Sequence, residues 1–460
     1  MHYEFKNKKI TVMGLGSFGG GVGVAQFLAK QGALVTITDL RNMPELSSSI
    51  KQLEGLPISY KLGGHCEEDF INTDMVVVNP AVPDNSKFLQ IARNNQVPLH
   101  TEINIFFSLC PAPIIGITGS NGKSTTTALL GKVLQQTSRT TWIGGNIGRS
   151  LLTNLEEIKP QGIVVLELSS FQLKELSGIK KSPHISIVTN ISPNHLDRHT
   201  GMDDYIQAKK TIITYQKPGD YAILNYDDPE LRRWEQECKS HVLWYSARQR
   251  IKNGAWIKDG NIVLSIYGQE RVIACTSRIK IPGNHNLQNI LAASCAAYLA
   301  GAHEQHMERI MTNFGGLEHR LEFVREIQGV RYYNDSKSTT PESAIAAMRA
   351  FQEPVILIAG GIDKGSNFEE FAETCIQQTK AIVLIGKMAH KIQELILQKT
   401  EGEKKLSIFI SNTFREAFQQ AHGIAKTGEI VLLSPACASY DMFLNYEERG
   451  RQFKNMVQAL

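Results

Sequence analysis

The stretch that most constrains this chain is IIGITGSNGKSTTT at residues 114–127. A short apolar run predicts a buried strand, and the glycine-rich turn after it opens into a helical pattern at Ala128. This is the layout of a phosphate-binding loop, in which backbone N–H groups and a helix N-terminus surround phosphate, a lysine neutralises charge and a hydroxyl ligates magnesium. Ile117 stands where the general pattern has a glycine, so the match is irregular. The loop predicts that the chain uses a nucleoside triphosphate.

Composition excludes several other classes of protein. The chain has 460 residues, too many for one core, with 42% hydrophobic and 20% charged residues as in ordinary globular proteins. A net charge of +4 indicates neither a nucleic-acid-binding nor a membrane-binding surface. Seven cysteines without a Cys-x-x-Cys pair favour free thiols in a reducing compartment. No apolar run approaches the length of a membrane span. We therefore expect a cytoplasmic protein.

Strands alternate with helical patterns in three segments, which predicts three wound α/β domains. We place them at residues 1–101, 102–316 and 317–460, with composition shifts near Cys110–Pro113 and Gly315–Gly316 as boundaries. The first and third are expected to be Rossmann-like, and the second ATPase-like with a parallel sheet. Short polar strands between residues 220 and 282 predict a small antiparallel sheet within it. Other strands are expected at 9–13, 34–38, 75–78, 162–166, 185–189, 331–333, 355–358, 381–385 and 430–433.

A second glycine-rich turn, GLGSFG at residues 14–19, lies between a predicted strand and a predicted helix, and Asp39 ends the next strand. Alone it is typical of dinucleotide-binding proteins and favours an oxidoreductase. However, such a turn at a helix N-terminus can hold any diphosphate, including that of a nucleotide sugar. Both interpretations remain open on this motif.

Polar side chains follow several other predicted strands. Glu167 is either a magnesium-supporting carboxylate at a strand end or an unimportant surface acid. His195 lies in a polar loop, where a histidine is more often solvated than a ligand. Lys209 lies in the helical stretch 205–213, where the pattern alone indicates a solvated side chain. Cys437 has no evident base nearby, which favours a buried thiol over a nucleophile.

Two asparagines in GNHNLQN at residues 283–289 are three positions apart and share a helix face. Helix capping explains one of them, Asn286 or Asn289, and two amides on one face could also bind a purine edge.

Taken in order, these motifs resemble the Mur ligase family, the ATP-dependent amide ligases that build the peptide of bacterial peptidoglycan. The resemblance spans the whole chain and is carried by TGSNGKS, ELSS, NISPNHLD, GNHNLQN, HR and NDSK at residues 118–124, 167–170, 190–197, 283–289, 319–320 and 334–337. The ending SPACASYD at 434–441, with Phe443 and Arg449–Gly450, resembles the D-glutamate-adding branch. Folylpolyglutamate synthase and other amino-acid-adding ligases share the ATP loop but should lack this ending.

The resemblance implies addition of D-glutamate to UDP-N-acetylmuramoyl-L-alanine through an acyl phosphate, with release of ADP and phosphate. The first domain would bind the UDP substrate, the second ATP and the third the amino acid. ATP and two magnesium sites are implied as cofactors. The expected partners are these small molecules, without nucleic acid or membrane, and we expect a monomer.

The resemblance also implies roles for individual residues. Catalytic roles fall to Lys123, His195, Lys209, Arg320 and Lys337. ATP would be bound by Gly119, Ser120, Asn121, Gly122, Lys123, Ser124, Thr125, Asn286, Asn289, Arg320 and Asp335. Magnesium would be held by Ser124, Thr125, Glu167, His195 and Lys209, the last as a carbamylated lysine. The other substrates would contact Ser17, Phe18, Asp39, Arg41, Asn146, Thr339, Lys364, Ser439 and Tyr446. Three positions depart from the family pattern, which usually has glycine, asparagine and phenylalanine where this chain has Ala81, Thr340 and Tyr446.

Overall fold

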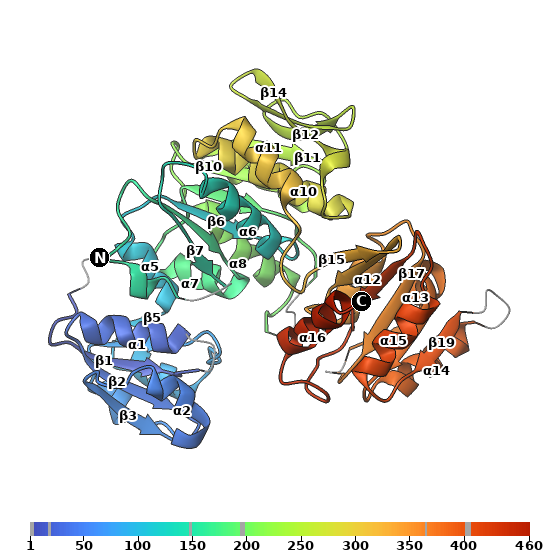
Figure 1. The fold of residues 1–460 in the computed structure, drawn as a ribbon. Helices are drawn as coiled ribbons and strands as arrows, with labels where there is room; N and C mark the ends of the chain where they lie inside the picture. Colours follow the sequence, from blue (N-terminus) through green and yellow to red (C-terminus); the bar gives the residue numbers. More distant parts are fainter. Residues whose placement is uncertain (1–3, 17–19, 147–149, 194–197, 364–365, 401–405) are drawn as a thin grey trace. The chain divides into compact units, whose positions relative to one another are not determined.

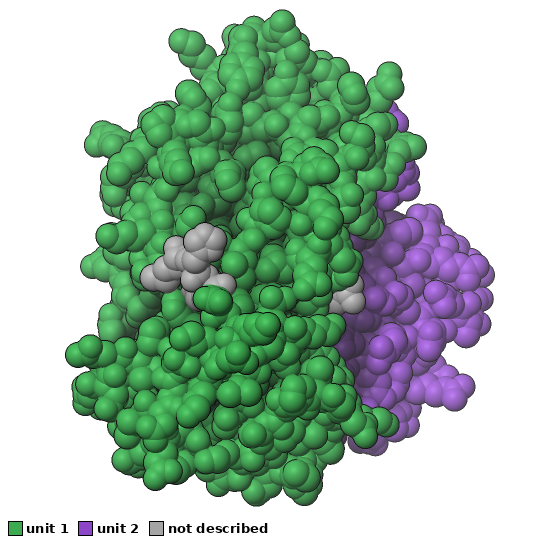
Figure 2. Space-filling view, turned by 90° about the vertical axis from the view of Figure 1, so that its left-hand side faces the viewer, with its two compact units in different colours: residues 1–275, 288–310 green, residues 276–287, 311–460 purple. Residues whose placement is uncertain are grey.

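The computed structural model describes residues 4–16, 20–146, 150–193, 198–363, 366–400 and 406–460. The chain forms two compact units, coloured separately in Figure 2: Met1–Cys275 with Gln288–Ile310, and Thr276–Leu287 with Met311–Leu460. The strands of the described ranges form three sheets, two in the first unit and one in the second (Figure 1). This confirms the predicted α/β class, whereas the domain limits at 101/102 and 316/317 stay predictions.

The first sheet is parallel, and its described strands have the order β3-β2-β1-β4-β5. Its central strands are apolar and buried because helices cover a parallel sheet of this kind on both faces. The strand order reverses between β1 and β4, and ligands of such folds bind at the carboxyl ends there. The strands are β1 (Lys9–Met13), β2 (Leu34–Asp39), β3 (Ile58–Leu62), β4 (Met75–Val78) and β5 (Leu99–His100). The helices are α1 (Gly20–Lys30), α2 (Met43–Lys51), α3 (Glu68–Ile71), α4 (Lys87–Asn94) and α5 (Glu102–Leu109).

The second sheet has the order β14-β13-β12-β11-β10-β9-β6-β8-β7 in the described chain. Pairing is parallel from β7 to β12 and antiparallel from β12 to β14. The strands are β6 (Ile114–Thr118), β7 (Thr141–Gly145), β8 (Ile163–Glu167), β9 (Ile185–Val188), β10 (Tyr221–Asn225), β11 (His241–Ser246), β12 (Gly254–Lys258), β13 (Asn261–Ile266) and β14 (Gln269–Cys275). The helices are α6 (Lys123–Leu134), α7 (Ser170–Gly178), α8 (Met202–Thr214), α9 (Pro229–Trp234), α10 (Asn284–Leu299) and α11 (Glu304–Asn313).

The antiparallel strands that we expected as a small separate sheet continue this second sheet. Two tight hairpins produce them, through Asp259–Gly260 and Tyr267–Gly268. All four residues have positive φ angles, from +49° to +79°. Turns of this type match the twist of the strands they join, so the hairpins extend the existing sheet edge.

The third sheet is mixed and lies in the second unit. Its order over the described strands is β15-β16-β20-β17-β18-β19, and only the β15–β16 pair is antiparallel among them. The strands are β15 (Glu322–Ile327), β16 (Val330–Asn334), β17 (Val355–Gly360), β18 (Thr379–Ile385), β19 (Ser407–Ile410) and β20 (Ile430–Leu433). The helices are α12 (Pro341–Met348), α13 (Glu369–Gln378), α14 (Ala389–Lys399), α15 (Phe414–Ile424) and α16 (Tyr446–Gln458).

The register of the second sheet brings three strand ends to one edge. Ile117 of β6 pairs with Glu167 of β8, and Thr118 pairs with Val188 of β9. The segments that follow these strands therefore emerge next to each other. None of the helices in the described ranges combines the length and apolarity that a membrane span needs.

Candidate active site

The phosphate loop joins β6 to α6, and two glycines determine its path. Gly119 and Gly122 have φ angles of +142° and +85°, a region that side chains rarely adopt. A Cβ at Gly122 would lie 2.3 Å from Oδ1 of Asn289, and one at Gly119 would lie 1.9 Å from Oγ1 of Thr189. Both positions therefore require glycine. The helix begins at Lys123, so the loop leads directly into its N-terminus.

Lys123 folds back over the loop that precedes it. Its Nζ donates to the carbonyl oxygens of Gly119 and Ser120, at 2.9 Å each. Ser124 and Thr125 follow it in the first turn of α6 and are buried. The ammonium, the helix N-terminus and two hydroxyls thus gather at one end of α6, an arrangement that suits a phosphate group and its counter-ion.

The segment that follows β9 holds the loop in place. The Ser120 hydroxyl donates to the Ser192 carbonyl at 2.8 Å and accepts the Ser192 N–H at 2.8 Å. It also lies 2.9 Å from the Tyr205 hydroxyl. The side-chain amide of Asn190 pairs with the backbone of Asn121, through both its oxygen and its nitrogen.

Glu167 ends β8 as a buried carboxylate, 2% exposed. Its Oε1 accepts the Asn146 amide at 2.9 Å, but its Oε2 is buried without a hydrogen-bond partner among the described residues. Leaving such an oxygen unpaired is costly, and a cation would remove the cost. Glu167 is thus not a solvated surface acid. In the described part of the chain, no cluster of three His, Cys, Asp or Glu side chains suits a metal, so a cation here would also need hydroxyl or other ligands.

Lys209 is buried in α8, contrary to the solvated position that its helical pattern alone indicated. It is 2% exposed, and its Nζ donates to the Gly119 carbonyl at 2.9 Å and lies 3.3 Å from the Thr118 hydroxyl. Burial lowers the pKa of Lys209 well below its usual value, the charge of Lys123 lowers it further, and the Glu167 carboxylate opposes both. A buried amine whose pKa lies below that of a solvated lysine therefore faces the phosphate loop.

Four expected site residues, Ser17, Phe18, His195 and Lys364, lie outside the described residues. The nearby His199 is described and is buried. Its Nε2 lies 2.9 Å from the Ser170 hydroxyl, its Nδ1 lies 2.9 Å from the Asp204 carboxylate, and its ring stacks on Phe171. With both nitrogens paired, His199 serves the structure rather than a ligand.

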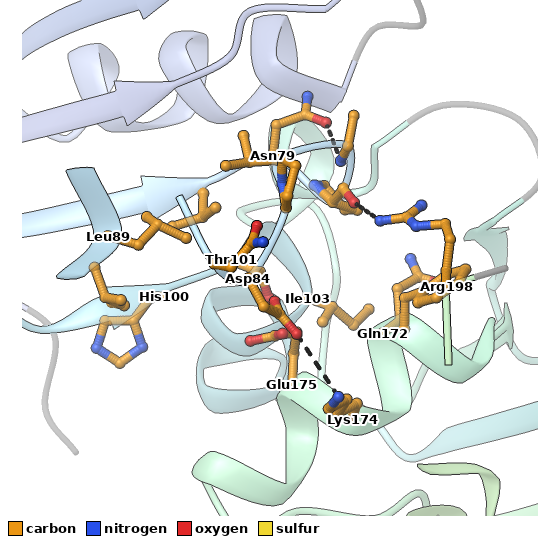
Figure 3. Close-up of a pocket in the computed structure, with 18 of the residues that line it drawn as sticks. Asn79, Asp84, Leu89, His100, Thr101, Ile103, Gln172, Lys174, Glu175 and Arg198 are labelled. Atoms are coloured by element: carbon orange, nitrogen blue, oxygen red, sulfur yellow. Dashed lines mark hydrogen bonds and ion pairs between the residues drawn. The ribbon is translucent and has the colours of Figure 1, made fainter. Parts of the chain in front are cut away.

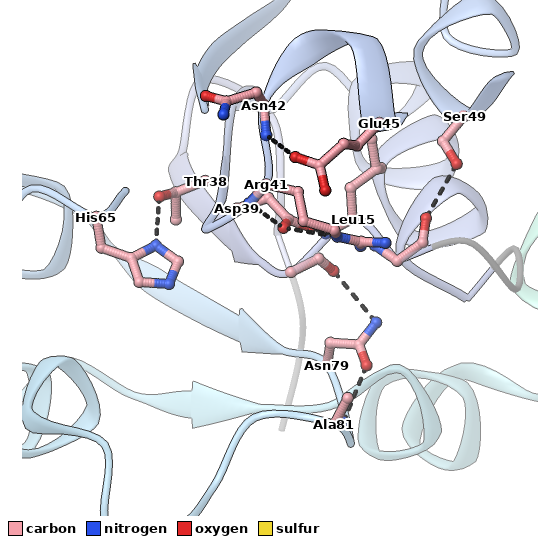
Figure 4. Close-up of polar contacts among 12 residues, drawn as sticks. Leu15, Thr38, Asp39, Arg41, Asn42, Glu45, Ser49, His65, Asn79 and Ala81 are labelled. Atoms are coloured by element: carbon pink, nitrogen blue, oxygen red, sulfur yellow. Dashed lines mark hydrogen bonds and ion pairs between the residues drawn. The ribbon is translucent and has the colours of Figure 1, made fainter. Parts of the chain in front are cut away.

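Asp39 uses its carboxylate inside the protein (Figure 4). Its Oδ2 accepts the N–H groups of Leu15 and Gly16 at 2.9 and 3.4 Å, within the first glycine-rich turn. Its two oxygens also accept the guanidinium of Arg41, and Oδ1 accepts the Arg41 N–H. These bonds hold the pKa of Asp39 below its usual value although burial opposes them. Asp39 therefore shapes the turn, and Arg41 is held beside it.

A cavity of about 620 Å³ lies at the carboxyl ends of β4 and β5, with α7 on its opposite wall (Figure 3). Lys174 lies 3.6 Å from the Asp84 carboxylate across it. Arg198 donates to the Pro80 carbonyl at 2.9 Å and covers the Phe171 ring, 4.2 Å from its centre. Segments far apart in the sequence form its walls, so sequence reasoning did not find it.

In the second unit, Asp335 follows β16 and is 2% exposed. Its Oδ1 accepts the Leu321 N–H at 3.0 Å, and its Oδ2 accepts the Ser434 hydroxyl at 2.7 Å. Burial raises the pKa of Asp335 to about 6, although the hydrogen bonds and the charge of Arg320 act against the shift. Asp335 therefore lies between the ends of β16 and β20.

Arg449 of α16 joins the two loops that carry Lys337 and Ser439. Its Nε donates to the Ser336 hydroxyl at 3.0 Å, and its Nη2 donates to the carbonyls of Ser336 and Cys437 at 2.9 and 3.3 Å. The Cys437 thiol is buried, which raises its pKa to about 12. It stays protonated at neutral pH, in agreement with the buried-thiol interpretation.

Other expected residues of this unit lie near these loops. The Lys337 Nζ is 5.9 Å from the centre of the Tyr446 ring, and the Thr339 N–H donates to the Lys337 carbonyl at 2.9 Å. Ser439 is buried two positions after Cys437, and Asn286 is buried in α10.

Three wound sheets, with a phosphate loop at the carboxyl edge of the middle one, define a multidomain nucleotide-dependent α/β enzyme. Three family sequence models match the chain: "Mur ligase MurD-like, N-terminal domain" at residues 8–101, "Mur ligase middle domain" at 117–297 and "Mur ligase, glutamate ligase domain" at 319–437. The chain belongs to the Mur ligase family.

Relatives match along the whole length. The chain is 43% identical to a UDP-N-acetylmuramoylalanine--D-glutamate ligase of Roseiflexus sp., covering 99% of both chains. It is 40% identical to the protein of that name from Thermoanaerobacter pseudethanolicus, again covering 99% of both. Among solved structures, a MurF ligase from Thermotoga maritima in complex with ADP has the same fold, with a TM-score of 0.60, 16% identity and coverage of 100% of both chains.

Sequence reasoning missed the residues that hold the site together. Asn190 lies in a motif that the sequence analysis recognised, but it was assigned no role. The contacts of Tyr205 and Arg449 with the loops were not predicted either. The only available signal was the position of Asn190 just beyond a strand end, where ligands of wound sheets gather.

Proposed function

We infer that this chain is an ATP-dependent amide ligase that adds D-glutamate to UDP-N-acetylmuramoyl-L-alanine in peptidoglycan precursor synthesis. One observation carries this inference: the identity of 40% and more, over 99% of both chains, to ligases named for this reaction. The oxidoreductase that the first glycine-rich turn favoured is set aside, because the chain belongs to a ligase family throughout its length.

The reaction requires two displacements. The substrate carboxylate attacks the γ-phosphorus of ATP, which forms a C–O–P bond and releases ADP. The D-glutamate amine then attacks the acyl carbon, forms the amide, loses a proton and expels phosphate. Both steps bring charged groups together, so positioning and charge stabilisation provide most of the catalysis.

For ATP, we propose the phosphate loop from Gly119 to Thr125 as the site of the β- and γ-phosphates. The position of Lys123 over the loop and the N-terminus of α6 support this role. Asn289, beside Gly122, would contact the nucleotide with Asn286. Arg320 and Asp335 would complete the ATP site, and Lys337 would stabilise the developing charge.

For magnesium, the donor set fits a hard cation. Glu167 offers a buried carboxylate oxygen without a described partner, and Ser124 or Thr125 offers a hydroxyl at the start of α6. We propose a second site at His195 and Lys209. The ions would neutralise phosphate charge and polarise the phosphorus for attack.

A neutral Lys209 amine could add carbon dioxide, forming a carbamate and releasing a proton. The lowered pKa of this buried lysine supports that proposal, because only the neutral amine is a nucleophile. A carbamate would give the site an anionic oxygen ligand in place of a cation that repels metal.

For the other substrates, we propose Ser17, Phe18 and the Asp39–Arg41 pair for the UDP moiety and Asn146 for the sugar-peptide. D-glutamate would contact a separate group of residues in the second unit: Thr339, Lys364, Ser439 and Tyr446. We further propose that the protein acts in the cytoplasm as a monomer on these small-molecule substrates, without nucleic acid or membrane.

The test is phosphate release from ATP in the presence of UDP-N-acetylmuramoyl-L-alanine. Release should require D-glutamate and should yield the amide in equal amount. Preference for L-lysine or meso-diaminopimelate would identify another member of the family. Turnover of a folate with L-glutamate would identify a folylpolyglutamate-type ligase.

A further inference from the structure

The phosphate loop lacks the glycine that usually starts it, because Ile117 occupies that position in the buried strand β6. Its central peptide is held by contacts from outside the loop. The described contacts identify the segment directly after β9, residues 189–192, as that support.

Asn190 contacts both polar groups of one loop peptide unit. The N–H of Asn121 donates to its side-chain oxygen at 3.0 Å, and its side-chain N–H donates to the Asn121 carbonyl at 3.1 Å. This two-bond pairing has the form of a short strand ladder, so it fixes the orientation of the residue as well as its position. The backbone of Asn190 adds a third bond, since its carbonyl accepts the Ser120 N–H at 2.9 Å.

The neighbouring Thr189 restricts the loop from the same side. Its hydroxyl donates to the Asn121 carbonyl, and its position leaves no space for a side chain at Gly119. The Thr189 carbonyl in turn accepts the Asn225 amide and the Tyr245 hydroxyl, at 2.9 Å each, in the buried interior. The support is thus anchored in the sheet itself.

We propose that Asn190 is a positioning residue for the nucleotide: its amide holds the Asn121 backbone so that Gly122 and the N-terminus of α6 meet the phosphates in a prearranged loop. The proposal rests on the proposed binding of ATP at this loop. Prearrangement matters because N–H groups aimed at a phosphate before it arrives lose no ordering entropy on binding.

Substitution of Asn190 tests this directly. Asn190→Ala removes both side-chain bonds and should weaken ADP binding about tenfold, the effect expected for losing about one net hydrogen-bond energy of positioning. Asn190→Asp keeps the acceptor for the Asn121 N–H but sets a carboxylate against its carbonyl and near the phosphates. It should weaken ADP binding more than Asn190→Ala does. Calorimetric titration with ADP and magnesium measures both.

Two further readouts separate positioning from general stability. The KM for ATP should rise while the KM for D-glutamate stays within about twofold. Amide hydrogen exchange in residues 119–127 of the nucleotide-free protein should accelerate in Asn190→Ala. Asn253→Ala is the matched control, because it also removes a side-chain-to-backbone bond in this unit, to the Val242 carbonyl at 3.3 Å, and it should change neither readout.

A folded Asn190→Ala that binds ADP within about twofold of the unaltered protein would overturn the proposal. If Asn190→Ala does not fold, the isosteric Asn190→Asp is the test. If Asn190→Asp then binds ADP as tightly as the unaltered protein, the proposal is also overturned. An unaltered protein that binds no ADP would instead refute the proposed ATP site.

Discussion

At the scale of single residues, the site buries ionisable side chains of types that proteins usually leave exposed. Lys209 and Glu167 are each 2% exposed, and Lys123 influences the pKa of Lys209. Burying charged groups is costly unless they are paired or bind ions. This burial supports the roles proposed above for both side chains, and the lowered pKa of Lys209 agrees with the concentration of perturbed pKa values at functional sites.

Lys209→Ala should remove most activity, at least about a hundredfold in kcat, because a metal-supporting oxygen would be lost. Short carboxylates or bicarbonate should restore part of it, as measured by phosphate release. Lys210→Ala is the matched control. The Nζ of this neighbouring lysine forms an ion pair with Oε1 of Glu237, at 2.7 Å, rather than a contact with the phosphate loop. Full activity in Lys209→Ala would refute the proposed role.

Sequence patterns alone could not find Lys209, because three turns of a helix with mixed polarity do not reveal which face is buried. Only the family resemblance singled it out. For Glu167, the strand end was predictable, whereas the burial of Oε2 without a partner among the described residues depends on the neighbouring strands. Asp39 was expected to contact a ligand, and its bonds to the backbone of the glycine-rich turn could not be read from the sequence.

At the scale of elements, the apolar strands of the wound sheets were the most predictable parts of the molecule. Apolar runs gave β1, β4, β9 and β20 to within a residue at each end. The start of α6 was less predictable, since Lys123 to Thr127 are polar and precede the periodic apolar positions. The shared sheet of β6 and β14 was unpredictable because strand pairing is decided at long range.

Gly122→Ala should weaken ADP binding at least about tenfold, since its Cβ would meet the Asn289 side chain 2.3 Å away. Gly55→Ala separates this clash from backbone strain, because Gly55 has a similar φ of +81° but nothing within 4 Å of the added Cβ. Both variants should lose thermal stability through backbone strain, Gly122→Ala more because of its clash, and only Gly122→Ala should lose affinity for ADP by calorimetry. If Gly122→Ala binds ADP as tightly as Gly55→Ala does, the close approach of Asn289 to Gly122 is unimportant for binding.

At the scale of the whole molecule, the chain organises its chemistry in two compact units with separate cores. The succession of three wound α/β segments along the chain followed from alternating strand and helix patterns, because such units can wind in few ways. The limits of the compact units could not be predicted in this way, because the division falls within α10. The start of this helix, up to Leu287, belongs to the second unit, and the rest, from Gln288, belongs to the first. Contacts between residues far apart determine where such a limit falls.

Global stability should depend on Asp335. The folded-state pKa of Asp335, about 6, exceeds its unfolded value. The stability that the protonated carboxyl contributes to the folded protein is therefore fully present below about pH 4 and is lost as the pH rises through about 6. Asp335→Asn cannot ionise at this position. Its free energy of unfolding relative to that of the unaltered protein should therefore increase from about pH 5 to about pH 8, and its ligase activity should be reduced. Denaturant midpoints at the two pH values measure this, and a relative loss toward pH 8 would contradict it.

The bonding of Asp39 has a consequence for inhibitor design. Its carboxylate already accepts the Leu15 and Gly16 N–H groups and the Arg41 side chain. A compound built to hydrogen-bond with Asp39 would have to displace these donors, and the exchange would yield little affinity. Medicinal chemistry at the first glycine-rich turn would gain more from matching the backbone contour that Asp39 imposes there than from addressing the acid itself.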